Sequence, residues 1–134
     1  MRLHTGEVLH EIIEKFAREN SIVNATLSIV GGADAGSKIV VGPTIPVTGK
    51  IVPLHYVLEA PSEITGTGTL FRDEDGNPIM HMHGSVGRQG KSTTGCFRAG
   101  VIAWLVLEVV ITELVGEGPY RKEDDFNGFK ILEI

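Results

Sequence analysis

Apolar residues recur every three or four positions near the start of the chain, which is the period of one face of an α-helix. The apolar positions are Val8, Leu9, Ile12, Ile13, Phe16 and Ala17. Mostly charged residues fill the positions between them. We therefore expect an amphipathic helix over about residues 6–19, with Thr5 as its N-cap and its end at Asn20.

After this helix the pattern changes to alternation, and β-branched residues become frequent, which indicates strands. The expected strands cover residues 22–31, 37–41, 54–58, 64–72, 79–86 and 93–99, and then an apolar segment up to residue 114. Prolines predict a loop over residues 43–53. The charged tail over residues 116–127 is expected to be a loop, and residues 129–134 an edge strand.

Two predicted turns indicate which strands in the middle of the chain are neighbours in the sheet. Asp-Glu-Asp-Gly-Asn-Pro at residues 73–78 predicts a hairpin between the strands on either side of it. Gly-Arg-Gln-Gly-Lys at residues 87–91 reverses the chain again. The prediction is a single α+β domain over residues 1–134, with a mostly antiparallel sheet of about six or seven strands and one main amphipathic helix.

The sharpest chemical feature is the segment His81-Met82-His83 in one of these strands. Residues i and i+2 of a strand project from the same face, with Cα atoms roughly 6.5–7 Å apart. Two imidazoles at this spacing can converge on one metal ion. Such pairs also occur for surface polarity alone, so the spacing leaves both interpretations open.

Cys96 bears on that choice because it lies on the strand after the next turn, about opposite His83. A thiolate there would complete a three-ligand site with an open fourth position. Zinc or another divalent transition metal suits two imidazoles and a thiolate. The alternative is that Cys96 is a buried core thiol, the usual place of a lone cysteine.

Other ionisable residues give weaker signals. His4 and His10 are expected on the surface, and His55 could approach the site without any spacing that demands it. Glu108 is the one charge in an apolar run, where it either faces solvent or acts as a base near a metal-bound water. Glu59 is ambiguous in the same way. Both are weak catalytic candidates, and the sequence leaves it open whether the protein is an enzyme.

The composition of the chain limits which partners and which cellular location we expect. The 134 residues carry a net charge of −5, with lysines and arginines scattered along the chain. A nucleic-acid binder normally presents a basic face, so the charge disfavours binding to duplex DNA without a partner protein. Residues 1–7 contain no apolar core of a signal peptide, no apolar run is long enough to span a membrane, and there is one cysteine. These features predict a cytoplasmic protein without membrane contact.

The order of elements and several motifs resemble the plants and prokaryotes conserved (PPC) domain family. Residues 2–9 are similar to the family's Gly-Glu helix start, and residues 75–83 to its Gly-x-Pro-x-x-His-x-His segment. Residues 84–97 resemble its glycine turn and following strand, and residues 99–114 its valine-rich closing strand. The chain thus looks like a free-standing prokaryotic member of this family.

The resemblance implies an α+β fold that forms homotrimers, with the sheet partly buried between subunits. It also implies a metal site built from His81, His83 and a later histidine, at whose position this sequence has Cys96. Family members are often described as DNA-binding, but that description rests on an Arg-Gly-Arg-Pro AT-hook that this sequence lacks.

Three function classes follow from these observations. The first is a homotrimeric metal-binding module that could also bind a small-molecule ligand. The second is a metal-dependent enzyme of unknown substrate, which needs a base such as Glu108 or Glu59 near a metal-bound water. The third, disfavoured by the net charge, is a DNA-binding or regulatory protein.

Overall fold

The structure is a computed structural model that describes residues 1–45, 50–126 and 128–134. Its helices are α1 (Leu9–Glu19) and the short 3-10 helix η1 (Phe97–Ala99). The strands are β1 (Arg2–Leu3), β2 (Asn24–Ala33), β3 (Lys38–Pro43), β4 (Pro53–Val57), β5 (Ser62–Arg72), β6 (Pro78–Arg88), β7 (Lys91–Cys96), β8 (Ala103–Glu113), β9 (Tyr120–Glu123) and β10 (Lys130–Glu133).

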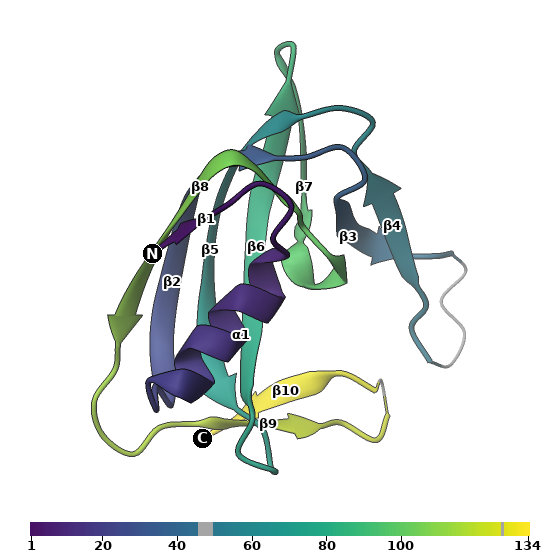
Figure 1. Cartoon of the computed structure of the whole chain (residues 1–134). Helices are drawn as coiled ribbons and strands as arrows, with labels where there is room; N and C mark the ends of the chain where they lie inside the picture. Colours follow the sequence, from purple (N-terminus) through teal and green to yellow (C-terminus); the bar gives the residue numbers. More distant parts are fainter. Residues whose placement is uncertain (46–49, 127) are drawn as a thin grey trace.

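Eight of these strands form one sheet in the order β1-β8-β2-β5-β6-β7-β3-β4, and every neighbouring pair is antiparallel. The predicted α+β class with one main helix is confirmed, whereas the predicted count of six or seven strands is too low. The additional strand β1 is only two residues long, which is too short for an alternating pattern to reveal it. Figure 1 shows β3 and β4 projecting to the right of the main sheet.

One face of the sheet is closed by α1, which crosses it in Figure 1. The helix buries Leu9, Ile13 and Ala17, and the strands contribute alternate residues to the same core, such as Leu27 in β2 and Met82 in β6. We call this side of the sheet the closed face. Its apolar positions are the ones that the 3.6-residue and two-residue periods predict.

The opposite side, which we call the open face, carries the residues that alternate with the core. Thr67 in β5 and Val30 in β2 are exposed there. Its lower end is covered by a separate two-stranded sheet of β9 and β10, the C-terminal hairpin (Figure 1). The prediction of a loop over residues 116–127 is therefore wrong for Tyr120–Glu123, where charged residues form a strand because Lys130–Glu133 pairs with it.

The structure corrects the start of α1. Thr5 is not its N-cap, because the Thr5 hydroxyl accepts a hydrogen bond from the backbone N–H of Leu105 in β8 at 3.0 Å. Val8 takes the N-cap position without a side-chain hydrogen bond, while the predicted C-terminal end at Asn20 is confirmed. Parts of the two predicted loops, residues 46–49 and Asn127, lie outside the described residues.

Within the described part of the chain, none of the helices has the length and apolar character needed to span a membrane.

Candidate metal centre

The two histidines lie side by side on the open face of β6. His81 and His83 are exposed, while Met80 and Met82, which alternate with them, are buried on the closed face. The neighbouring positions of β5 are Thr69 and Thr67, which pair with His81 and His83 respectively. The strand period alone therefore directs both imidazoles to the same side.

Cys96 reaches these histidines through the hairpin of β6 and β7. The loop has two residues, Gln89 and Gly90, with φ values of 53° and 75°. Positive φ at both positions is typical of a type I′ turn, whose twist suits a two-residue hairpin. The turn fixes the register so that Cys96 pairs directly with His83, as the sequence predicted.

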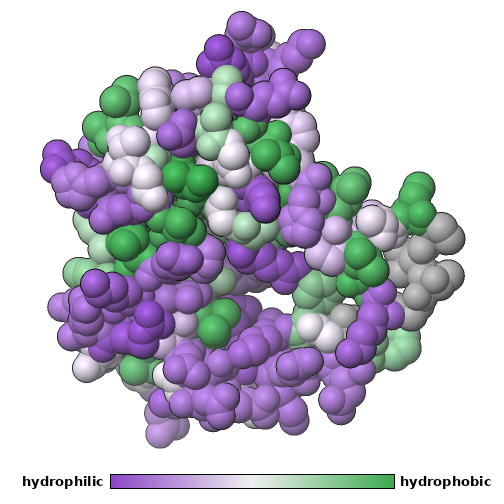
Figure 2. Space-filling model, turned by 45° about the vertical axis from the view of Figure 1, so that its right-hand side comes forward, coloured by the Kyte–Doolittle hydropathy of each residue, from purple (hydrophilic) through white to green (hydrophobic). Residues whose placement is uncertain are grey.

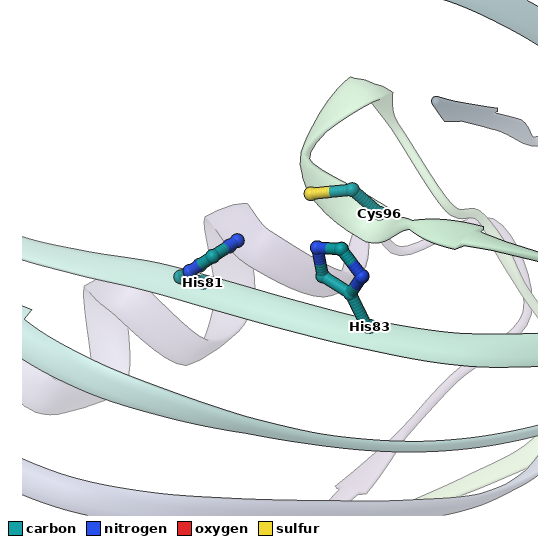
Figure 3. A group of neighbouring side chains, drawn as sticks. All are labelled: His81, His83 and Cys96. Atoms are coloured by element: carbon teal, nitrogen blue, oxygen red, sulfur yellow. The ribbon is translucent and has the colours of Figure 1, made fainter. Parts of the chain in front are cut away.

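The three potential ligand atoms converge. One atom from each of His81, His83 and Cys96 lies within 4.8 Å of the others, and Figure 3 shows the sulfur above the two rings. The ring centroids are 5.1 Å apart, with an interplanar angle of 82°. Tetrahedral zinc with bonds of 2.0–2.3 Å requires ligand separations of roughly 3.3–3.6 Å. The two exposed imidazole rings would have to rotate to reach these separations.

Phe97, the residue after Cys96, holds this end of β7 in place. Its side chain is fully buried on the closed face. Its ring packs onto Gly84 so closely that a Cβ there would lie 2.5 Å from the ring and would also collide with the carbonyl oxygen of Thr65. Glycine at position 84 therefore makes room for the ring. As a result, Cys96 is fixed between the buried Phe97 and the paired His83.

The electrostatic surroundings favour a neutral imidazole at His81. Partial burial lowers the pKa of His81, and the positive charges of Arg121, His83 and Arg98 lower it further. A neutral imidazole has a free lone pair for a metal, so this shift keeps His81 available as a ligand near neutral pH. Among the described residues, neither imidazole has a hydrogen-bond partner that would compete for it.

The other histidine predicted as a possible neighbour does not join this cluster. His55 lies in β4, where it pairs with Val40, and Val40 pairs on its other side with Cys96. One strand, β3, therefore separates His55 from the thiol. His4 is exposed, as expected.

The two carboxylates named as weak catalytic candidates also lie elsewhere. Glu108 is exposed on β8, and two strands, β2 and β5, lie between β8 and the histidines of β6. Glu59 follows β4 and lines a separate hollow of about 280 Å³ with Arg88 and Lys91. The structure brings neither carboxylate to the three ligand atoms.

Sequence reasoning missed the residues around a larger hollow of about 760 Å³ that His81 also lines. His10 is half-buried there, contrary to the expected surface position, and Arg98 and Arg121 lie in the same lining. Arg121 belongs to the tail predicted as a loop, and no local pattern places it near His81. The pairing of β9 with β10 and the contact of β9 with β5 bring it there.

The fold and this cluster define a class of small α+β domains in which one helix closes a face of an antiparallel sheet and the other face carries potential metal ligands. The chain belongs to the Plants and Prokaryotes Conserved domain family, whose model matches residues 1–115. This confirms the family resemblance inferred from the sequence. No curated protein matches the chain.

Several solved structures share the fold. A metal-containing protein from Archaeoglobus fulgidus has 25% identity and a TM-score of 0.83, over 100% of this chain and 91% of that chain. A plant- and prokaryote-conserved protein from Pyrococcus horikoshii has 24% identity and a TM-score of 0.81, over 100% and 89%. A protein from Ralstonia eutropha described as a candidate DNA-binding protein has 22% identity and a TM-score of 0.77, over 100% and 89%.

Proposed function

We propose that this protein is a single-domain metal-binding module that also binds a small ligand and assembles as a homotrimer. The observation that carries the proposal is the convergence of His81, His83 and Cys96 on the open face, with their ligand atoms within 4.8 Å of one another. Two exposed imidazoles beside a thiol have no role in the core, which is built from the alternate residues of the same strands.

The ligand set fits zinc or another divalent transition metal. Imidazole and thiolate are the ligands that zinc and its neighbours prefer, whereas calcium and magnesium prefer oxygen. Three protein ligands leave a fourth position open for water or for an external molecule. The Archaeoglobus fulgidus neighbour, described as metal-containing, supports the proposal by analogy.

A ligand-binding role is favoured over a metal-dependent enzyme. Catalysis at a metal-bound water needs a base within hydrogen-bond reach. The described cluster of ligand atoms includes no carboxylate, and Glu108 and Glu59 lie on other parts of the sheet. By contrast, a hollow large enough for a small molecule directly adjoins His81.

Assembly into a homotrimer is supported by exposed apolar side chains on β2 and β8. Val30, Leu105 and Val110 are 58%, 62% and 61% exposed. Leu105 lies at an irregularity in the pairing of β8 with β2 and has a φ of 55°, a conformation that a non-glycine residue adopts at a cost of about 1–2 kcal/mol. Burial of these side chains against a second copy would offset that cost.

A DNA-binding role, which is how the Ralstonia eutropha protein is described, has less support here. Binding to duplex DNA normally requires a basic surface that displaces counterions from the phosphates. This chain has a net charge of −5.

Elemental analysis of the purified protein tests the metal site. We expect about one transition-metal ion per wild-type chain and a strong loss of metal in His83→Ala. The matched control is His55→Ala, which removes an exposed strand histidine that β3 separates from Cys96. Equal metal content in His83→Ala and the wild type would refute the site, as would negligible metal in both after growth with added zinc.

Light scattering tests the assembly. A homotrimer has three times the 14.4 kDa mass of one chain. We expect Val110→Lys to lower the measured mass, because an exposed lysine on the open face would place charge in the interface. A wild-type mass of a single chain would contradict the proposal.

A further inference from the structure

The hollow beside His81 lies at the free edge of β6. β7 ends at Cys96, opposite His83, so among the described residues no strand pairs with residues 79–82 of β6 on that side. α1 borders the hollow with His10 and Glu14, and the C-terminal hairpin borders it with β10. In Figure 2 the lower surface of the molecule is largely hydrophilic. The volume of the hollow, about 760 Å³, is in the range of small-ligand sites.

A buried arginine lines this hollow. Arg121 is only 4% exposed as a residue, and its Nη2 donates a hydrogen bond to Thr69 Oγ1 at 2.8 Å. Its guanidinium also lies 5.8 Å from the centre of the Phe71 ring. The Nε–H is buried without a hydrogen-bond partner among the described residues. Burial without a counterion lowers the pKa of Arg121, and such a charge is costly unless an anion compensates it.

The nearby protein carboxylates are already engaged. Asp73 is next to Arg121 in the backbone pairing, but its carboxylate accepts hydrogen bonds from Lys130 and from the N–H groups of Asp75 and Asn77. Glu14 accepts a hydrogen bond from the backbone N–H of Met80 at 3.0 Å. Within the described ranges, therefore, Arg121 has no carboxylate at ion-pair distance.

Arg98 adds a second positive charge to the same lining. It is exposed, and its guanidinium lies 4.7 Å above the ring of Phe129. No carboxylate of the described residues pairs with it either. A divalent ion on two imidazoles and one thiolate would add a further net positive charge beside them. Even with the carboxylate of Glu14 in the lining, the arginines leave the hollow with an excess of positive charge among the described residues.

The remaining walls are apolar, since Ile79, Ile131 and Leu132 also line the hollow. Apolar walls favour an organic body over a bare inorganic ion. Guanidinium groups bind carboxylates through charge-assisted, often bidentate hydrogen bonds. We propose that the hollow binds a small organic acid, whose carboxylate is held by Arg121 and Arg98 and whose apolar body lies against the hairpin. This inference rests on the proposed ligand-binding role of the same site, although the arginines act whether or not a metal is bound.

A titration followed by nuclear magnetic resonance tests this proposal. The probes are hexanoate, benzoate and succinate, each compared with its neutral amide, on zinc-loaded protein and on protein stripped of metal with a chelator. We expect at least one acid to shift the signals of Ile79, Ile131 or Leu132 in a saturable way. Its amide should bind at least about 10-fold more weakly, because it lacks the charge-assisted hydrogen bonds.

Variants assign the effect to the arginines. Arg98→Met and Arg121→Met should each weaken binding of the acid at least about 10-fold. Lys91→Met, which removes an exposed positive charge that lines the separate hollow beside Glu59, should leave binding unchanged. Arg121→Lys keeps the positive charge and serves as a second variant in case Arg121→Met does not fold. It should bind the acid more tightly than Arg121→Met does. If Arg121→Met does not fold, the comparison is with Arg98→Met, and Arg121→Lys should again bind the acid more tightly.

The outcomes separate this inference from the proposed metal site. Zinc binding without binding of any of the three acids would overturn the organic-acid proposal and leave the metal site standing. Equal binding of acids and amides, or binding unaffected by Arg98→Met, would overturn it as well. If one of the acids binds but the protein never retains zinc, the result would refute the proposed metal site and leave the organic-acid proposal standing.

Discussion

Met80 and Met82 point to one side of β6 and His81 and His83 to the other, so four consecutive residues meet two opposite environments. The methionines are buried under α1 with the rest of the core, whereas the histidines are exposed on the open face. The same strand thus contributes to stability through one face and carries its chemical groups on the other. Substitutions at adjacent positions should therefore have separable effects.

The largest expected effect on stability is on the closed face. Met82→Ala removes a fully buried side chain and should lower the free energy of unfolding by about 3 kcal/mol, as large-to-small core substitutions do. Urea denaturation of metal-stripped protein measures this. The adjacent substitution His83→Ala should change it by less than about 0.5 kcal/mol under the same conditions. Comparable losses in both variants would show that the two faces are not independent.

The next largest effect concerns metal affinity on the open face. Cys96→Ser replaces the thiolate with a poorer ligand of similar size, and we expect zinc to bind at least about 100-fold more weakly. Competition with a chromogenic chelator gives the affinity. With cobalt in place of zinc, the thiolate-to-metal absorption of the wild type should disappear in the variant. An unchanged affinity would mean that Cys96 is a core thiol and not a ligand.

A smaller effect is expected where the C-terminal hairpin is attached to the sheet. The Asp73 carboxylate lies 2.8 Å from the Lys130 ammonium. Burial by itself would raise the pKa of Asp73, but the hydrogen bond and charge of Lys130 and the N–H groups of Asn77 and Asp75 outweigh it and lower the pKa from 3.8. A lowered pKa stabilises the folded state above the unfolded value, and this stabilisation is lost as the pH falls through the folded value.

We therefore expect the hairpin to exchange its amide hydrogens faster, relative to the core, once the pH falls below about 4. Asp73→Asn should cost about 1–2 kcal/mol near neutral pH and remove this acid dependence. Hydrogen exchange at Ile131 and Leu132 measures both the loss of stability in the variant and its dependence on pH. A hairpin that responds to acid equally in Asp73→Asn and in the wild type would contradict this account.

The smallest expected effect tests whether distance along the open face matters. Glu108 shares that face with the histidines, but β2 and β5 separate its strand from theirs. Glu108→Gln should leave the zinc affinity within about 2-fold of the wild type, which is the range of a surface substitution. A much larger change would mean that Glu108 acts on the metal, and the enzyme alternative would then regain support.

The sequence predicted the elements whose patterns are local. The alternation around His81 and the turn at Gln89 and Gly90 were sufficient to predict that Cys96 lies opposite His83, because strand period and hairpin length determine register. The family was recognised from these segments together with residues 2–9 and 99–114. Thr5 was assigned as a helix cap because its residue type suits that role, but its hydroxyl instead binds the distant Leu105.

The residues around the hollow could not be predicted in this way. Arg121 lies in a charged tail with no apolar period, and Lys130 in the strand predicted over residues 129–134. Their positions depend on contacts with Thr69 and Asp73, more than 50 residues earlier in the chain. His10 follows the helix pattern to the polar side, but the hairpin encloses that side. Such contacts depend on the tertiary arrangement, which no local pattern encodes.

X-ray absorption at the metal edge of the purified protein tests the central claim most directly, because it identifies the atoms bound to the ion. The account predicts one sulfur at about 2.3 Å and two imidazole nitrogens at about 2.0–2.1 Å, together with a light atom at the open position. The sulfur contribution should vanish in Cys96→Ser. A spectrum of the wild-type protein with oxygen and nitrogen ligands only would contradict the assignment of His81, His83 and Cys96 as the metal site.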